Sequence, residues 1–251
     1  MGQAMTLICI GGAEDKEGDL TVLKAVLSKA KGAQSRVCVI TTATGYPEET
    51  KETYIKVFEK LGIACEVMHI DTPAAANDSA TVKKIENADV IFFSGGDQSR
   101  LTAALDGTAS LAAVRSRHEA GAVVAGTSAG AAAMSALMVT GGQPEDAHLP
   151  GAITSGKGLS LVDDIIFDTH FLNRGRLPRL FNLISAHPAK TGIGLDEDTA
   201  VVMHGIGILE VIGSGAVTIV QKNVGVQGGE GVAEKDFKVT TLRSGNTHKL
   251  R

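Results

Sequence analysis

Short apolar runs alternate with longer amphipathic segments along the first half of the chain. The runs are rich in Val, Ile and Phe and are continuously apolar, which is typical of strands buried on both faces of a parallel sheet. The segments between them repeat apolar residues at helical spacing. Strands are predicted at 6–10, 36–41, 65–70, 90–94 and 122–125, and helices at 20–30, 47–61, 77–87, 98–106, 109–119 and 129–134.

The pattern changes in the second half of the chain. Residues 140–160 are rich in Gly, Pro and polar residues, which predicts a long irregular connection of the kind that serves as a lid or binding loop. A brief strand and a helix follow, and then come short apolar runs separated by Gly or Asp, which indicate antiparallel strands. The strand is predicted at 165–167, the helix at 177–186, the antiparallel strands at 192–195, 200–203, 207–212 and 217–221, and one edge hairpin in the last thirty residues.

Strands that alternate with helices predict an α/β protein. We expect three layers, with a mostly parallel sheet, helices on both of its faces and short antiparallel strands near the C-terminus. No linker-like change of composition separates the two halves. Residues 1–251 are therefore expected to form a single domain.

Composition narrows the class of protein further. The 251 residues are 43% hydrophobic and 21% charged, as in soluble proteins with a sizeable core. The net charge of −4 argues against a nucleic-acid or anionic-membrane partner. No apolar run reaches the length of a membrane helix and no basic leader precedes one. Cys9, Cys38 and Cys65 lie in apolar runs without C-x-x-C spacing, so we expect buried thiols in a cytoplasmic protein, without a disulfide or a metal.

The strongest chemical signal is a G-x-S-x-G turn at 126–130, between a predicted strand and a predicted helix. A strand that enters a helix so sharply strains the backbone of Ser128 and holds its hydroxyl clear of the sheet. The N–H groups at the start of the helix could stabilise a developing oxyanion. Ser128 is therefore a candidate nucleophile, and an ordinary glycine-rich turn is the alternative.

A serine nucleophile needs a histidine base and a carboxylate that orients it. Among seven histidines, His170 follows the predicted strand at 165–167, and functional groups collect at such strand ends. The α/β-hydrolase order of Ser, acid and then His would instead need another pairing. That pairing would draw on Asp163, Asp164 or Asp168 and on His187 or His204.

The order Ser128, His170 and then an acid leads to an acidic turn at 194–200. This turn lies between two apolar runs and could equally be a charged hairpin turn. The spacing alone does not choose among its three carboxylates. They are Asp196, Glu197 and Asp198.

Five blocks of the chain, taken together and in order, resemble the cyanophycinase-like serine peptidases of family S51 and clan PC. These are relatives of aspartyl dipeptidase with a flavodoxin-like sheet. The resemblance implies that fold here, with helices on both faces of the sheet. The blocks are 11–16, 93–98, 126–131, 168–171 with the arginines that follow, and 192–197.

The resemblance also implies roles for individual residues. Ser128 would be the nucleophile, His170 the base and Glu197 the third member of the triad. The backbone N–H groups of Gly96 and Ala129 would stabilise the oxyanion.

The resemblance further implies a substrate cleft. Its arginines would bind substrate carboxylates, and acidic residues such as Asp168 would receive substrate guanidinium groups. Thr169 stands where the family usually has Gln, which leaves the exact specificity open. The cleft would be lined by Gln98, Asp168, Thr169, Arg174, Arg176 and Arg179.

The function implied is a serine exopeptidase that hydrolyses cyanophycin to β-Asp-Arg dipeptides through an acyl-enzyme. Cyanophycin has an aspartate backbone with an arginine attached to each side-chain carboxyl. No metal or organic cofactor is expected. A homodimer is expected, because members of the family are commonly dimers. The alternatives are an aspartyl dipeptidase that acts on short Asp-X peptides and a non-catalytic or amidotransferase-like flavodoxin-type domain.

Overall fold

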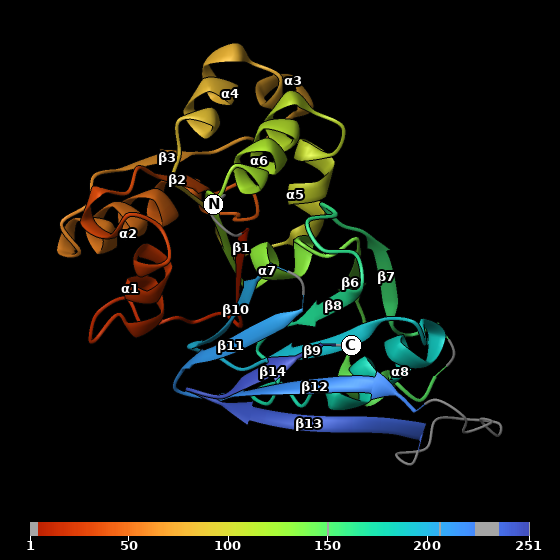
Figure 1. Cartoon of the computed structure of the whole chain (residues 1–251). Coiled ribbons are helices and arrows are strands. Elements are labelled where there is room, and N and C mark those ends of the chain that lie inside the picture. Colours follow the sequence, from red (N-terminus) through yellow and green to blue (C-terminus); the bar gives the residue numbers. More distant parts are fainter. Residues whose placement is uncertain (1–4, 150, 206, 224–235, 251) are drawn as a thin grey trace.

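The computed structural model describes residues 5–149, 151–205, 207–223 and 236–250. Its centre is an eight-stranded sheet with the order β14-β11-β10-β1-β5-β4-β2-β3 (Figure 1). Neighbouring strands from β1 to β3 in this order are parallel. These strands are β1 (Thr6–Ile10), β2 (Val37–Ile40), β3 (Cys65–Met68), β4 (Val90–Phe93) and β5 (Val123–Thr127).

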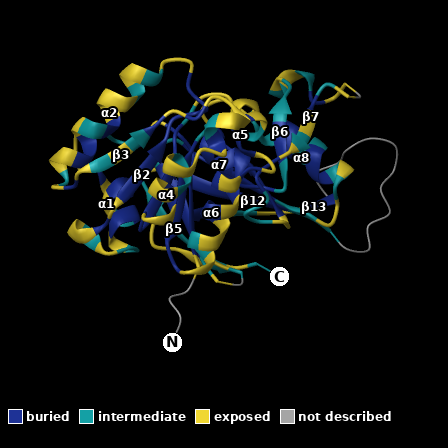
Figure 2. Cartoon of the chain, turned by 90° about the horizontal axis from the view of Figure 1, so that it is seen from above, coloured by how far each residue is buried: buried dark blue, intermediate teal, exposed yellow. Residues whose placement is uncertain are grey.

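Helices cover both faces of this sheet, as the pattern predicts. Alternate residues of β1 point to opposite faces: Ile8 and Ile10 contact one set of helices, and Leu7 and Cys9 face the other. Figure 2 shows the resulting buried middle layer between exposed outer surfaces. One face is covered by α1 (Thr21–Ser28) and α2 (Pro47–Lys60), and the other by α3 (Pro73–Ala76), α4 (Ser79–Glu86), α5 (Gln98–Leu105), α6 (Ala109–Glu119) and α7 (Ala129–Ala133).

The C-terminal part extends the central sheet and builds a second one. Strands β10 (Thr199–His204), β11 (Ile208–Gly213) and β14 (Thr247–Lys249) add antiparallel strands beside β1. The predicted α/β class with antiparallel strands near the C-terminus is thereby confirmed. The second sheet has the order β13-β12-β9-β8, with β8 (Ile165–Asp168), β9 (Thr191–Leu195), β12 (Ala216–Lys222) and β13 (Phe237–Arg243), and α8 (Leu177–Ala186) packs on it.

One core cluster joins the two sheets. It includes Leu7 and Val124 from the central sheet and Ile193 and Val217 from the second. This continuity supports a single domain, which stays a prediction. Among the described helices, none combines the length and apolar character needed to cross a membrane.

Two local predictions are wrong. Residues 140–160 were expected to be irregular, but β6 (Leu137–Gly141) and β7 (Thr154–Lys157) pair antiparallel, with a 3-10 turn at Pro144–Asp146 between them. Backbone pairing holds this hairpin without an apolar pattern. β9 is antiparallel to β12, as predicted, and its other neighbour β8 is parallel to it. The predicted edge hairpin is not formed by β13 and β14, because these strands join different sheets, and residues 224–235 lie outside the described residues.

Candidate active site

The turn from β5 to α7 holds Ser128 in a strained conformation, with φ 51° and ψ −113°. Its N–H donates to the Ile10 carbonyl at 2.9 Å, which fixes the turn to the neighbouring strand. A Cβ on Gly126 would lie 2.7 Å from the Gly130 backbone, and one on Gly130 would lie 2.4 Å from the Phe93 carbonyl oxygen. The glycines therefore permit a contact that no side chain allows. The predicted strained turn at Ser128 is confirmed.

His170 lies two residues after the end of β8 and faces Ser128. Its Nε2 is 2.9 Å from Ser128 Oγ, which is within hydrogen-bond distance. The His170 backbone is left-handed, with φ 48°, and its N–H donates to the Gly11 carbonyl at 2.8 Å. Two residues in uncommon backbone conformations thus meet here, and the surrounding hydrogen bonds hold them in place.

Glu197 is the carboxylate of the acidic turn that reaches the histidine. Its Oε1 is 2.7 Å from His170 Nδ1, and its Oε2 accepts from Asn173 Nδ2 at 3.0 Å. Since a carboxylate only accepts, Nδ1 carries the proton and Nε2 is free to accept one from the serine. Asp196 is buried and accepts two backbone N–H groups, and Asp198 accepts a third. The three carboxylates are therefore distinguished by the direction in which the turn points them.

The alternative histidines and acids lie elsewhere. His204 is at the end of β10, with Nε2 3.6 Å from a Glu210 oxygen. His187 caps the C-terminal end of α8. Asp163 and Asp164 are exposed ahead of β8. The α/β-hydrolase order is not the arrangement that this chain adopts.

Two residues with backbone N–H groups line the cavity together with Ser128. A Cβ on Gly95 would lie 3.4 Å from Ser128 Cβ, so the loop after β4 runs directly beside Ser128. Gly96 has φ +141°, and a Cβ there would lie 2.0 Å from a backbone oxygen. Within the described part of the chain, the N–H groups of Gly96 and Ala129 have no hydrogen-bond acceptor. Both residues line the same cavity as Ser128, where an oxyanion could accept from them.

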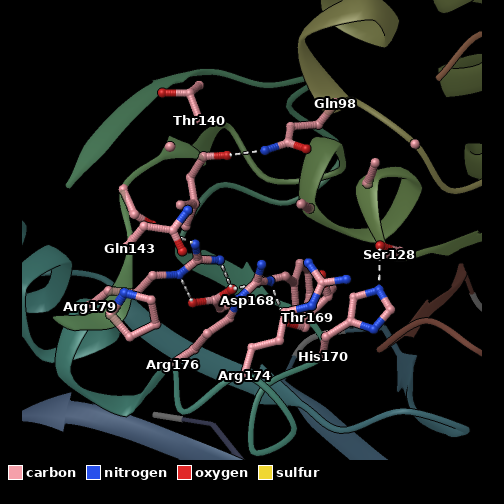
Figure 3. Close-up of a pocket in the computed structure, with 18 of the residues that line it drawn as sticks. Gln98, Ser128, Thr140, Gln143, Asp168, Thr169, His170, Arg174, Arg176 and Arg179 are labelled. Carbon is pink, nitrogen blue, oxygen red and sulfur yellow. Dashed lines mark hydrogen bonds and ion pairs between the residues drawn. The ribbon is translucent and has the colours of Figure 1, made fainter. Parts of the chain in front are cut away.

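This cavity has a volume of about 480 Å³ and is open to solvent. Figure 3 shows Ser128 and His170 on one side and Arg179 on the other, with Arg176 and Arg174 between them. Glu197 lies behind His170, and all other predicted site residues line the cavity. The lining includes Gly96, Gln98, Ser128, Ala129, Asp168, Thr169, His170, Arg174, Arg176 and Arg179, together with residues 139–145.

The acid among the arginines is already bound. Asp168 is 1% exposed, and both of its oxygens accept from Arg179, through Nε at 2.7 Å and through Nη2. Arg176 Nη1 is 3.3 Å from Oδ1 of the same carboxylate. The expectation that Asp168 is available for a substrate guanidinium is therefore wrong, because Arg176 and Arg179 already neutralise it. Arg174 is exposed and makes no ion pair with any described residue.

The other predicted cleft residues also make contacts within the chain. Burial lowers the pKa of Arg176 to about 10 while Asp168 acts to raise it, so Arg176 is charged at neutral pH. Its Nη1 also donates to the carbonyl of the buried Thr169. Gln98 Nε2 donates to the Val139 carbonyl at 2.6 Å. These contacts tie α5, β8 and the β6–β7 hairpin around one cavity.

Sequence reasoning missed two parts of the site. One is Asn173, which holds the second oxygen of Glu197 and lies between the predicted histidine and arginines. The other is the set of polar residues within 139–145: residues 140–160 were predicted as a possible binding loop, but Thr140, Gln143 and Glu145 were not named as site residues. In the described parts of the chain, no group of three or more His, Cys, Asp or Glu could hold a metal ion.

A strained serine at a strand-to-helix turn, with a histidine and a carboxylate in hydrogen-bond sequence, is the arrangement that serine hydrolases use. The sequence profile of Peptidase family S51 matches residues 6–211. The chain belongs to this family and is a serine-type peptidase.

Similar proteins agree with this assignment. The cyanophycinase of Nostoc sp. is 36% identical over 216 residues, which cover 85% of this chain and 72% of that protein. The cyanophycinase of Geminocystis herdmanii is 35% identical over 217 residues, covering 86% of this chain and 80% of that protein. The crystal structure of a peptidase from an acI-B1 actinobacterium matches with a TM-score of 0.78, covering 100% of this chain and 99% of that one. At 21% identity this last likeness supports the fold alone.

Proposed function

We propose that this peptidase hydrolyses cyanophycin, or closely related β-aspartyl-arginine peptides, to β-Asp-Arg dipeptides. The observation that carries the proposal is the hydrogen-bonded chain Ser128–His170–Glu197 at the edge of a cavity that also holds three arginines. The two relatives described above are cyanophycinases. A cytoplasmic homodimer is part of the proposal.

In the proposed mechanism, Ser128 Oγ attacks the scissile carbonyl while His170 Nε2 takes its proton. The carbonyl oxygen becomes an oxyanion that accepts from the N–H groups of Gly96 and Ala129. His170 then gives the proton to the leaving amine, the C–N bond breaks and an acyl-enzyme remains. Water attacks the acyl group, with the same histidine taking and returning a proton. Glu197 keeps the proton on Nδ1 and stabilises the imidazolium.

The charges around the cavity support a zwitterionic substrate group. Each arginine of cyanophycin carries a guanidinium and its own free carboxylate. With Asp168 neutralised, Arg174 and Glu145 are the lining residues of opposite charge without an ion pair among the described residues. We propose that Arg174 binds the carboxylate and that Glu145 binds the guanidinium.

The experiment compares cyanophycin with α-linked Asp-Arg, identifying products by mass spectrometry and trapping the acyl-enzyme by rapid quenching. We expect β-Asp-Arg dipeptides and a trapped adduct on Ser128. The Ser128→Ala variant should lose about 10⁴–10⁶-fold in turnover. Faster hydrolysis of the α-linked peptide would instead identify an aspartyl dipeptidase. If Ser128→Ala hydrolysed the substrate as fast as the wild-type protein, Ser128 would be excluded as the nucleophile.

A further inference from the structure

The loop between β1 and α1 touches every segment that supplies the proposed triad, although none of its residues has a role in the mechanism above. The Gly11 carbonyl accepts from the His170 N–H at 2.8 Å. The Gly12 carbonyl accepts from the Asp198 N–H at 2.9 Å, and the Asp15 N–H donates back to Asp198 Oδ1 at 2.9 Å. The loop thus fixes both the base and the acidic turn through its backbone.

Its third contact is made by a buried side chain. Glu14 is 3% exposed, and its Oε2 accepts a short hydrogen bond from the hydroxyl of Thr127, the residue directly before Ser128. Its Oε1 accepts from the Tyr54 hydroxyl at 3.0 Å and lies 2.7 Å from Lys16 Nζ. One carboxylate therefore joins α2 and the β1–α1 loop to the end of β5.

A buried carboxylate is costly unless it is paired and fully hydrogen-bonded. Here Lys16 supplies the positive charge that pairs with Glu14, and Tyr54 and Thr127 supply hydroxyl donors to it. Burial raises the pKa of Tyr54 well above its ordinary value, and the nearby Glu14 charge raises it further. The phenol therefore remains a donor. Hydrogen bonds to a charged acceptor are stronger than neutral ones, which makes this a firm anchor for Thr127.

The anchor lies where the backbone is most strained. Ser128 has φ 51° and ψ −113°, a conformation that persists only when neighbouring contacts determine it. The Ser128 N–H is held by the Ile10 carbonyl, and the residue before it is held by Glu14. We propose that Glu14 is a positioning residue for the nucleophile. Through the Thr127 hydroxyl it keeps the 127–128 peptide in the orientation that aims Ser128 Oγ at His170. This inference rests on the proposed role of Ser128.

The test measures how fast a fluorophosphonate probe labels Ser128, by intact-protein and peptide mass spectrometry, per folded molecule. Thr127→Val removes the hydroxyl and keeps the shape, so labelling should slow about 10- to 100-fold, since small misplacements of a reacting group cost this much. Thr127→Ser restores the hydroxyl and should stay within about threefold of the wild-type rate. A role in stability alone would lower the folded fraction without changing the rate per folded molecule.

Tyr54→Phe is the second variant, because it removes one hydroxyl from Glu14 with little change of shape. We expect labelling about three- to tenfold slower than in the wild-type protein. Asp89→Asn is the matched control. Asp89 is a buried carboxylate paired with Lys31 and Arg36, and it precedes β4 at the opposite end of the sheet from the site. Its removal should leave the labelling rate unchanged.

Each outcome separates this inference from the proposed function. A wild-type protein that is not labelled at Ser128 would overturn the proposed nucleophile, and with it this inference. Normal labelling of the wild type together with an equal rate in Thr127→Val, or an equally slow rate in Thr127→Ser, would overturn the positioning role alone. If Thr127→Val does not fold, an unchanged rate in Tyr54→Phe overturns it.

Discussion

The two sides of the cavity use acids in opposite ways. On the serine side, Glu197 binds one nitrogen of His170 and leaves the other facing Ser128. On the arginine side, Asp168 binds Arg179 through both oxygens and Arg176 through one. The first acid orients a histidine that we propose as the base, whereas the second cancels charge that would otherwise face the cavity. A carboxylate next to a basic side chain is therefore not by itself evidence of a catalytic role.

Exposure separates the two acids as well. The Asp168 side chain is 1% exposed and the Glu197 side chain is 36% exposed. A fully buried ion pair is destabilising to break, because the remaining charge is left without water or a partner. A partly exposed carboxylate can lose its partner at much smaller cost to the fold. We therefore expect substitutions on the serine side to affect turnover and substitutions at Asp168 and its partners to affect stability.

Among substitutions at the two acids and the residues around them, the largest effect is expected for Glu197→Gln. The amide would no longer favour the required tautomer of His170, so turnover should fall about 10³- to 10⁴-fold. Steady-state kinetics with thermal unfolding as a fold check measures this. Asp198→Asn in the same turn is the control and should retain far more activity. Near-normal turnover in Glu197→Gln would move the orienting role to a neighbouring carboxylate.

The next effect is on stability. Arg179→Leu leaves the buried Asp168 with Arg176 alone, and we expect the free energy of unfolding to fall by about 3–5 kcal/mol. Denaturant unfolding monitored by circular dichroism measures it. Replacing Asp168 by Leu in the same protein should recover only part of the loss, because the buried carboxylate is gone but Arg176 then lacks its partner. A single variant as stable as the wild type would show that this pair is not a structural one.

The smallest effect is expected for Arg174, the arginine outside the ion-pair cluster. Arg174→Gln should lower kcat/KM for β-Asp-Arg substrates about 10- to 100-fold, since one charge-assisted pair is lost. A neutral activated ester should be hydrolysed almost normally, because it needs only the serine, the base and the oxyanion donors. An equal loss on both substrates would show that Arg174 supports the protein structure and does not bind the substrate carboxylate.

Glu145→Gln is the companion to that variant. It should weaken substrates that carry a guanidinium and spare an analogue in which citrulline replaces arginine, because citrulline is uncharged. Comparison of kcat/KM for the two substrates measures the difference. Equal losses on both would place the guanidinium elsewhere in the cavity.

Much of the fold could be predicted from the sequence because strands such as β2 and β4 are uninterrupted apolar runs. The elbow at Ser128 and the strand end before His170 could be predicted for the same reason, since local signals mark both. The β6–β7 hairpin could not, because Gly141 and Gly156 give no alternating pattern for its pairing. The hairpin also depends on tertiary contacts with α5 and α8, through Gln98 and Arg179, which no local pattern predicts.

The limits at the site have a similar physical origin. Residue spacing does not distinguish Asp196, Glu197 and Asp198, because the choice depends on which way each side chain leaves the turn. Asp198 takes a left-handed backbone with φ 47°, which directs its carboxylate away from His170. The burial of Asp168 beside Arg179 depends on how α8 docks, and this is a tertiary contact that no local pattern encodes.

β1 lies between β5 and β10 in the sheet, and these two neighbours are synthesised at different times. The serine elbow is translated well before β8, the acidic turn and β10, and until those segments emerge β1 has no partner on one side. Translation at about 5–20 residues per second leaves an interval of several seconds. During that interval Ser128 lacks both His170 and Glu197. The proposed triad can therefore assemble only after residue 197 has been made.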